Sequence, residues 1–304
     1  MSVLKGKLEN FQVPDGHDVY NPTIPFMYNG REIVAIRLEP RINEFASIVV
    51  FYQKDGKNRW VRDHKLPSFS MQDPFITKTR NEYILGGVKV TPNPNFPNES
   101  NYSTVIYVGK SLENMFLYYE SPNKMKGIRI LELENRKIAV FSRPQVLSSK
   151  DPMGRGRIAF ALIDNLTQIT VGIQRAEIIE GLYKDEEWGG CNEVHELDNG
   201  DLGILGHIAY FDEKGNRHYH VTTFEFNPTT KKVSNHRVIV KREIFPKGIK
   251  VKRQDLEDVL YPGGIRKIAT SDKYEVFVGI SDTSSGKVEI GSPFSSTPKL
   301  KLHS

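Results

Sequence analysis

Short apolar runs separated by turn residues recur along this 304-residue chain, and no other feature limits the fold as strongly. The runs are rich in Val, Ile, Tyr and Phe, as in REIVAIRLE, EYILGGVKV and LGILGHIAYF. Such residues favour strands, whereas the Gly and Asn of turns such as YNGRE, LENRK and DEKGNR tolerate the positive φ of tight hairpins. Helical periodicity is scarce. The sequence therefore predicts an all-β protein.

A degenerate repeat underlies this pattern. Each unit begins with a polar or Pro-containing stretch, such as YNPTIPF or MQDPFIT, and continues with a turn and an apolar strand that ends in a polar residue. The starts are marked by residues 52, 54, 65 and 69 positions apart: Pro22, Pro74, Ile128, Glu193 and Pro262. Units of about 40 to 50 residues with four strands are typical of propeller blades. We therefore predict a single five-bladed β-propeller domain over residues 1–304, with blades near 18–66, 67–122, 123–180, 181–250 and 251–304.

A two-sheet sandwich or a pair of small β domains is the alternative to a propeller. Against both, no Pro/Ser-rich linker marks a boundary, and the repeat continues through the middle of the chain. In a propeller, the innermost strand of each blade lines a central channel, so the starts of distant units would meet at one mouth.

Polar residues recur at the same phase of successive units. Those at the first strands are Asn21, Asp73, Lys126, Arg129, Asn192, Glu193 and Asp258, and those that end second strands are Arg37, Arg143, His207 and Asp282. A funnel of carboxylates, arginines, amides and a histidine suits hydroxyl-rich or phosphate-bearing ligands. We expect Asn21, Asp73, Arg143, Glu193, His207 and Asp282 to face one pocket.

Composition narrows the classes of partner. The 42 basic and 37 acidic residues give a net charge of +5, and the longest basic cluster, Lys247–Arg253, is predicted to be a solvated loop face. No platform of aromatic and basic residues accompanies it, so no nucleic-acid partner is expected. No apolar run reaches targeting or membrane-spanning length, so we expect a cytoplasmic protein without a membrane partner. A homo-oligomer stays open.

Other site chemistries are less well supported. The single cysteine, Cys191, excludes an intramolecular disulfide or a multi-cysteine metal site, and it is predicted to pack in the core. His195, His207, His218 and His220 do not complete a ligand set, so neither a metal nor a cofactor is expected. The stretch GRGR at 154–157 lacks the Gly-Lys-Ser/Thr ending of a phosphate loop.

The order of several motifs resembles a known family. YNPTIPF, VAIR, QDPFI, FSRP, LGILGH, VLYPGGI and VGISDT follow one another as in the five-bladed propeller glycosidases of the mannoside phosphorylase and mannosidase family. The resemblance spans roughly residues 18 to 290. Gln72 stands where that family has Glu, Phe75 where it has Arg, and EEWGGCNEV lacks its lysine and paired prolines. These systematic departures indicate an uncharacterised branch, a domain family of unknown function.

The resemblance implies roles for individual residues. Asp73 matches the catalytic aspartate, which acts as general acid, in some members through a sugar hydroxyl. Arg143 and His207, with Tyr219 as a looser match, correspond to phosphate contacts, and Arg37 and Asp282 lie near the sugar. The remaining predicted substrate contacts are Asn21, Gln72, Lys126, Arg129 and Asn192.

The residues fit more than one activity on a small oligosaccharide, such as a mannoside. Cleavage of a glycosidic bond needs a proton on the leaving oxygen and a nucleophile at the anomeric carbon. In a hydrolase, Glu193 would activate water as the second carboxylate. In a phosphorylase, inorganic phosphate would be the co-substrate, held by the cationic side chains. The alternative from another class is a non-catalytic carbohydrate-binding or scaffold propeller.

Overall fold

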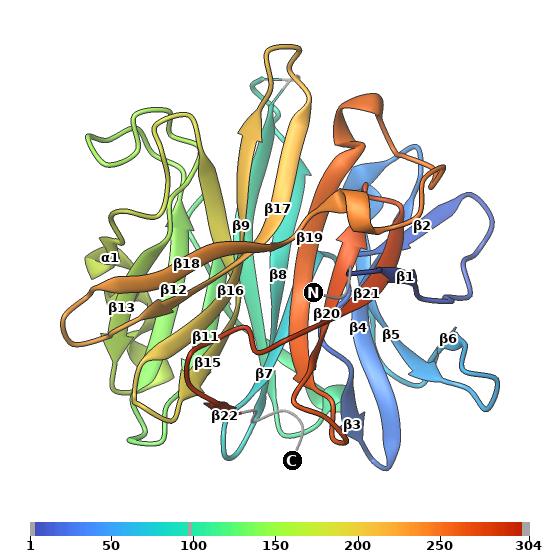
Figure 1. Ribbon diagram of the computed structural model, residues 1–304, viewed down its shortest axis with the longest axis horizontal. Coiled ribbons are helices and arrows are strands. Elements are labelled where there is room, and N and C mark those ends of the chain that lie inside the picture. Colours follow the sequence, from blue (N-terminus) through green and yellow to red (C-terminus); the bar gives the residue numbers. More distant parts are fainter. Residues whose placement is uncertain (1–3, 97–98, 300–304) are drawn as a thin grey trace.

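The computed structural model describes residues 4–96 and 99–299, and strands dominate these ranges (Figure 1). Within them, α1 (Ile169–Arg175) is the one α-helix. The predicted all-β class is confirmed. None of the helices in the described part of the chain is long and apolar enough to span a bilayer.

The first three sheets are antiparallel and follow one another along the chain. The first comprises β2 (His17–Tyr20), β3 (Phe26–Tyr28), β4 (Arg31–Pro40), β5 (Ile48–Lys54) and β6 (Trp60–Arg62). The second comprises β7 (Gln72–Lys78), β8 (Tyr83–Pro92), β9 (Ser100–Gly109) and β10 (Phe116–Glu120). The third comprises β11 (Met125–Glu132), β12 (Ile138–Pro144), β13 (Ala159–Ile163) and β14 (Glu177–Ile178).

The remaining strands form one larger sheet with two antiparallel halves. One half comprises β15 (Trp188–Leu197), β16 (Leu202–Phe211), β17 (Arg217–Phe226), β18 (Val233–Val240) and β22 (Pro298–Lys299). The other comprises β1 (Lys7–Leu8), β19 (Asp258–Lys267), β20 (Tyr274–Ile280) and β21 (Ser284–Ile290). A short parallel pairing between β17 and β19 joins the halves. Because β1 pairs with β21, the beginning of the described chain completes the last group of strands.

The apolar cores lie between neighbouring groups of strands. Second strands such as β4, β12, β16 and β20 are buried along nearly their whole length, which explains their continuous apolar sequences. Phe141 on β12 packs its ring 6.1 Å from that of Phe226 on β17, and both side chains are fully buried. Burial of a Phe side chain stabilises a fold by roughly 1.5–3 kcal/mol. Neighbouring groups therefore pack apolar side chains against one another.

The first strand of each later group carries a register shift against its second strand. The shifts lie at Gln72/Phe75, Lys126/Arg129, Cys191/Glu193 and Pro262/Gly264. A bulge of this kind bends the strand and turns side chains in a new direction. These positions coincide with the unit starts at Pro74, Ile128, Glu193 and Pro262. The repeat seen in the sequence therefore marks the points at which these first strands change the direction of their side chains.

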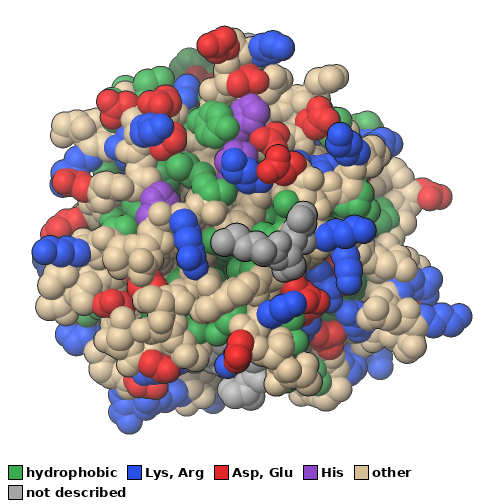
Figure 2. Space-filling view, in the orientation of Figure 1, with side chains coloured by type: hydrophobic (Ala, Val, Ile, Leu, Met, Phe, Trp, Pro, Cys, Tyr) green, Lys and Arg blue, Asp and Glu red, His purple; other side chains and the backbone are tan. Residues whose placement is uncertain are grey.

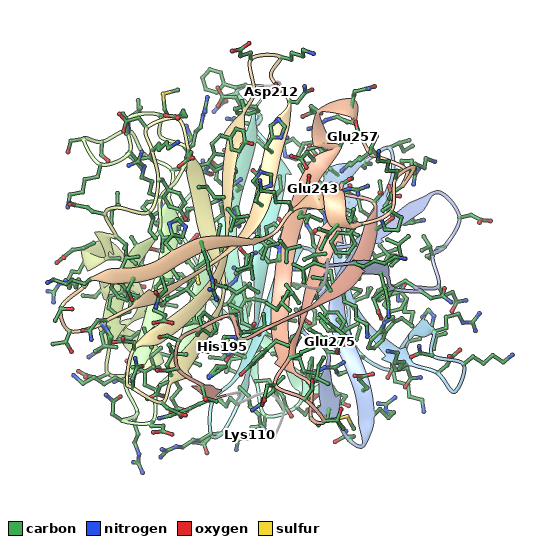
Figure 3. All side chains as sticks on the ribbon, viewed as in Figure 1. Lys110, His195, Asp212, Glu243, Glu257 and Glu275 are labelled. Carbon is green, nitrogen blue, oxygen red and sulfur yellow. The ribbon has the colours of Figure 1, made fainter. Side chains whose placement is uncertain are left out.

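Two labelled residues mark opposite ends of the molecule. In Figure 3, Asp212, on the turn between β16 and β17, lies at one end of the molecule, and His195, on β15, lies toward the other. We call the end with Asp212 the mouth end. In the face seen in Figure 2, Lys and Arg are intermixed with Asp and Glu.

The basic segment Lys247–Arg253 lies between β18 and β19. Lys247 is exposed, as predicted for a solvated loop face. For Lys252 that prediction is wrong, because its side chain is only 10% exposed and its ammonium pairs with the fully buried Glu39. A local basic composition could not reveal a carboxylate supplied by β4, far away in the sequence.

Candidate functional site

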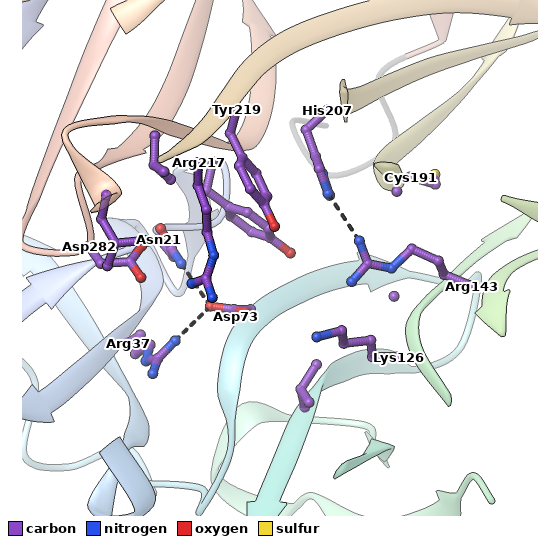
Figure 4. A pocket seen from close by; sticks show the side chains of 16 residues that line it. Asn21, Arg37, Asp73, Lys126, Arg143, Cys191, His207, Arg217, Tyr219 and Asp282 are labelled. Carbon is purple, nitrogen blue, oxygen red and sulfur yellow. Dashed lines mark hydrogen bonds and ion pairs between the residues drawn. The ribbon is translucent and has the colours of Figure 1, made fainter. Parts of the chain in front are cut away.

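A cavity of about 130 Å³ lies beside the register shifts of the first strands (Figure 4). Its charged and polar walls come from every group of strands, because Arg37 lies on β4, Asp73 on β7, Lys126 on β11, His207 on β16 and Asp282 directly after β20. The residues that line it are Asn21, Arg37, Asp73, Val88, Lys126, Gly127, Arg143, Gly190, Cys191, His207, Arg217, Tyr219, Leu256, Val259, Tyr261 and Asp282.

Asp73 lies at the centre of the hydrogen bonds drawn in Figure 4. Its Oδ1 accepts from Asn21 Nδ2 at 2.7 Å and from Arg37 Nη1 at 3.1 Å. Asp73 has a φ of 50° and Asn21 a φ of 52°, in the left-handed region that Asn and Asp tolerate best among residues with a Cβ. Among the described residues, no hydrogen bond reaches Oδ2, so this oxygen is free to contact a ligand.

Arg37 connects Asp73 to a buried carboxylate. Its Nε donates to Glu39 Oε2 at 3.0 Å, and its Nη2 pairs with the same oxygen. Burial alone would lower the pKa of Arg37, but Tyr20 and the acidic side chains around it raise that pKa above its ordinary value. Arg37 therefore stays charged and fixes one face of Asp73.

Asp282 is the second carboxylate of the pocket. It follows β20 in a left-handed conformation with a φ of 54°. Burial first, and then the negative charges of Asp73 and Glu39, raise its pKa to about 6, against the opposing effects of Arg37 and Lys252. Asn21, Arg37, Asp73 and Asp282 together form what we call the acidic half of the pocket.

Replacing Asp282 by Asn should stabilise the fold at high pH. An acid whose pKa is raised in the folded state makes folding less favourable as pH rises through that pKa. A rise from 3.8 to about 6 corresponds to roughly 3 kcal/mol, which partial exposure of the side chain reduces to on the order of 1 kcal/mol. Asp282→Asn should therefore unfold at higher temperature than wild type at about pH 8, and with little difference at about pH 4. Thermal unfolding across this range tests it, and an equal effect at both pH values would contradict the assigned cause.

The opposite side of the cavity, which we call the cationic half, holds Lys126, Arg143 and His207 (Figure 4). Arg143 is buried and its Nη1 donates to His207 Nε2 at 3.2 Å, while its buried Nε has no hydrogen-bond partner among the described residues. Within the same part of the chain, neither Arg143 nor Lys126 forms an ion pair with a carboxylate. Burial first, and then the charge of Arg143, lowers the pKa of Lys126 to about 7.

His207 is held as a neutral imidazole. Burial, and then the positive charges of Arg143, Arg129 and Lys126, hold its pKa well below the usual range. Its Nδ1 lies 2.7 Å from Asn192 Oδ1 and therefore carries the proton, which leaves Nε2 to accept from Arg143. Its ring stacks on Tyr219 at 5.3 Å. His207 thus orients the guanidinium without adding charge.

Four predicted site residues do not line the cavity. Gln72 Nε2 donates to the Glu44 carbonyl at 2.9 Å, and Asn192 Oδ1 accepts a hydrogen bond from His207 Nδ1. Arg129 donates to the carbonyl of Asn192 at 2.7 Å and to the hydroxyl of Tyr261 at 3.2 Å. These three act as buried connectors between groups of strands.

Glu193 is also absent from the cavity wall, which corrects the expectation that it faces the same pocket as Asp73. Its Oε2 accepts from the backbone N–H of Ile265 at 2.7 Å and lies 2.9 Å from His195 Nε2. A Cβ on Gly264 would lie 3.0 Å from Glu193 Oε1, so this glycine makes room for the carboxylate on β19. Glu193 is therefore committed to joining β15 and β19.

Eight residues of the wall were not predicted from the sequence, and they are Val88, Gly127, Gly190, Cys191, Arg217, Leu256, Val259 and Tyr261. Arg217 was part of a turn and strand sequence, GNRHYH, without a special signal, and Leu256 lay beside a basic loop. Tyr261 and Gly190 lie within unit starts but carry no charge. The predicted packing role of Cys191 agrees with its burial, which raises the pKa of its thiol, although it also borders the cavity.

Two of the histidines that were considered as metal ligands each contact a carboxylate. His218 Nδ1 lies 2.6 Å from Asp258 Oδ2, and His195 contacts Glu193. Over residues 4–96 and 99–299, no group of three or more His, Cys, Asp or Glu is placed to hold a metal ion.

Residues 2–296 match the family described as "Protein of unknown function (DUF1861)". No curated protein sequence matches the chain significantly. Among solved structures, MPT-4, a mannose phosphorylase from Leishmania mexicana in complex with a phosphate ion, is 27% identical, with a TM-score of 0.88 over 99% of this chain and 93% of that chain.

Two further structures extend the comparison. MPT-1, a GDP-Man-dependent mannosyltransferase from Leishmania mexicana, is 27% identical, with a TM-score of 0.87 over 98% of this chain and 93% of that one. A β-1,2-mannobiose phosphorylase from Listeria innocua, 14% identical, shares the fold with a TM-score of 0.63 over 92% of each chain. The resemblance to mannoside phosphorylases found in the sequence is thereby confirmed.

Proposed function

The chain belongs to the DUF1861 family, and we propose that it is a glycoside phosphorylase that cleaves a mannoside of small size with inorganic phosphate. One observation carries the proposal: the cationic half holds Lys126 and Arg143 without a carboxylate partner among the described residues, in the same cavity as Asp73 (Figure 4). Unpaired buried cations are costly unless an anion binds them. The likeness to a mannose phosphorylase that binds phosphate supports the same ligand.

Each half of the pocket has a part in the proposed reaction. The Asp73 Oδ2 proton passes to the glycosidic oxygen, directly or through a sugar hydroxyl, while the bond from that oxygen to the anomeric carbon breaks. A phosphate oxygen, oriented by Arg143 and Lys126, forms the new bond to the anomeric carbon. The products are mannose 1-phosphate and a saccharide with a free hydroxyl, and the proton carried by hydrogen phosphate restores Asp73.

A hydrolase is supported less well. An inverting hydrolase needs a second carboxylate that activates water. Glu193, the residue expected to do so, is engaged by Ile265 and His195 outside the cavity wall. Phosphate brings its own nucleophilic oxygen, so phosphorolysis does not need that base.

The proposal includes the architecture around the pocket. We infer that the first three sheets and the two halves of the larger sheet are the five blades of one propeller domain, with boundaries near those expected from the repeat. The contribution of wall residues by every group supports this, as does the pairing of β1 with β21.

The test is an incubation of purified protein with small manno-oligosaccharides, with and without inorganic phosphate. We expect mannose 1-phosphate only in the presence of phosphate, measured by ion-exchange chromatography and ³¹P NMR. Free mannose without phosphate would instead indicate a hydrolase. A parallel reaction with GDP-mannose tests transfer from a sugar nucleotide, the activity of the second structural neighbour. Saccharide binding without any turnover would favour a binding or scaffold propeller.

The use of phosphate should depend on pH through Lys126. With a pKa of about 7, the ammonium loses its proton as pH rises from about 6 to about 8.5, so one cation facing phosphate disappears. A charged hydrogen bond contributes roughly 1.5–3 kcal/mol, so the KM for phosphate should rise about tenfold or more over this range. Lys126→Arg keeps the charge and should abolish most of the rise. The ionisation of phosphate itself affects both proteins equally, so identical profiles would exclude Lys126 as the cause.

A further inference from the structure

Lys252 reaches from the segment between β18 and β19 to a buried carboxylate on β4. Its Nζ pairs with Glu39 Oε1, and the two side chains are 10% and 0% exposed. The Lys252 ammonium also lies 5.9 Å from the centre of the Tyr20 ring. A buried ion pair offsets the cost of removing its two charges from water only if its geometry is good and further hydrogen bonds hold both partners.

The segment that carries Lys252 is fastened to the turn that carries Asp282. The backbone N–H of Lys252 donates to the carbonyl of Ser281 at 3.3 Å, and the hydroxyl of Thr283 donates to the carbonyl of Lys250. Further back, Arg242 Nε donates to Ser281 Oγ at 3.3 Å. Because these hydrogen bonds hold the backbone of the segment, the Lys252 side chain projects from an anchored stretch of chain and not from a free loop.

The two oxygens of Glu39 have different partners. Oε1 accepts from the hydroxyl of Tyr20 at 3.0 Å and from Lys252, while Oε2 accepts from Arg37 and from Ser47. An arginine and a carboxylate ordinarily form two parallel hydrogen bonds to both oxygens. With Oε1 occupied, Arg37 is confined to Oε2, and its Nη1 remains available to donate to Asp73 at 3.1 Å.

We propose that Lys252 is a positioning residue, which occupies Glu39 Oε1 and thereby holds the Arg37 guanidinium against Asp73. Without Lys252, only the Tyr20 hydroxyl remains on Oε1, so Arg37 can turn toward this oxygen as well and withdraw from Asp73. Lys252 touches neither substrate nor phosphate in this role. The inference rests on the proposed function, because the position of Asp73 affects turnover only if Asp73 acts in the reaction.

The pH titration of Asp282 supplies a readout that a purely structural role would not move. The charged and titratable groups that face Asp282 are Tyr20, Arg37, Glu39, Asp73, Lys252 and Arg253. Because Lys252 lowers the pKa of Asp282, its removal should raise that pKa further. The midpoint of the Asp282 titration, followed by NMR, should then move to higher pH.

A double-mutant cycle tests the connection through Glu39. Lys252→Met should lower kcat by roughly 10- to 100-fold, the usual cost of a small displacement of a reacting group, with the KM for phosphate nearly unchanged. Lys252→Arg should recover most of the activity. In the Glu39→Gln background, Lys252→Met should have little further effect, since the carboxylate through which it acts is gone. Lys247→Met, an exposed lysine of the same segment, is the matched control and should behave as wild type.

Crystal structures of the wild type and of Lys252→Met give a readout without turnover. We expect Arg37 Nη1 to move away from Asp73 Oδ1 in the variant. If Arg37 stays in place, or if the losses from Lys252→Met and Glu39→Gln simply add, the inference is overturned. If no protein turns over any mannoside but Arg37 moves as expected, the proposed function fails while the positioning role of Lys252 stands.

Discussion

Replacing Asp73 by Asn should abolish most phosphorolysis, with a fall in kcat of roughly 10²- to 10⁴-fold, the usual contribution of a positioned acid. The amide has no proton of suitable acidity for the glycosidic oxygen, but it retains an oxygen that accepts from Asn21 and Arg37. Asn also tolerates the left-handed backbone at this position, where φ is 50°. The variant should therefore fold normally, and calorimetric titration should show binding of phosphate and of the saccharide close to that of wild type.

Asp212→Asn is the matched control for this change. Asp212 lies on the turn between β16 and β17 at the mouth end, but it does not line the cavity (Figure 3). The control should keep wild-type kcat. Substantial turnover by Asp73→Asn, or an equal loss in Asp212→Asn, would falsify the assignment of Asp73 as the acid.

Replacing Arg143 by Ala should impair the use of phosphate by roughly 10²- to 10³-fold in kcat/KM, while binding of the saccharide alone changes little. The guanidinium offers a buried Nε without a partner among the described residues and a fork that can hold two phosphate oxygens. Two charged hydrogen bonds of about 1.5–3 kcal/mol each account for a loss of this size. The measurement is the phosphate dependence of mannose 1-phosphate formation.

Two further variants are compared with Arg143→Ala. Arg143→Lys keeps the charge but not the fork, so its kcat/KM should lie between those of Arg143→Ala and wild type. Arg175→Ala removes an exposed arginine at the end of α1 and should have no effect. If Arg143→Ala uses phosphate as well as Arg175→Ala does, phosphate is bound elsewhere and the cationic half has another role.

Much of the fold and part of the site follow from local sequence. The apolar second strands are continuous because they are buried on both sides, and the unit starts carry the polar residues because the register shifts there turn side chains inward. Asn21, Asp73, Arg143, His207 and Asp282 accordingly line one cavity, as expected from their phase in the repeat.

The failures have a common physical origin in contacts between groups of strands. Phase in the repeat placed Glu193 beside Asp73, but the missing side chain of Gly264 opens a different space for it. The charge of Lys252 is satisfied by Glu39, 213 positions away in the chain. Neither partner is recognisable from residues nearby in the sequence, and no repeat predicts where a glycine on a neighbouring strand will make room.

The left-handed backbone at Asn21, Asp73 and Asp282 has an evolutionary consequence. Apart from glycine, only Asn and Asp fit such positions with little strain, so the charge of the acidic half can change cheaply only by exchange of a carboxylate for an amide. At Asp73 that exchange removes the proposed acid, and at Asp282 it removes a carboxyl group whose pKa is raised by burial first and then by the neighbouring negative charges. If the proposed function holds, a single exchange at Asp73 should remove catalysis and leave the fold intact. Inactive descendants that still hold a sugar are the expected by-product of this architecture.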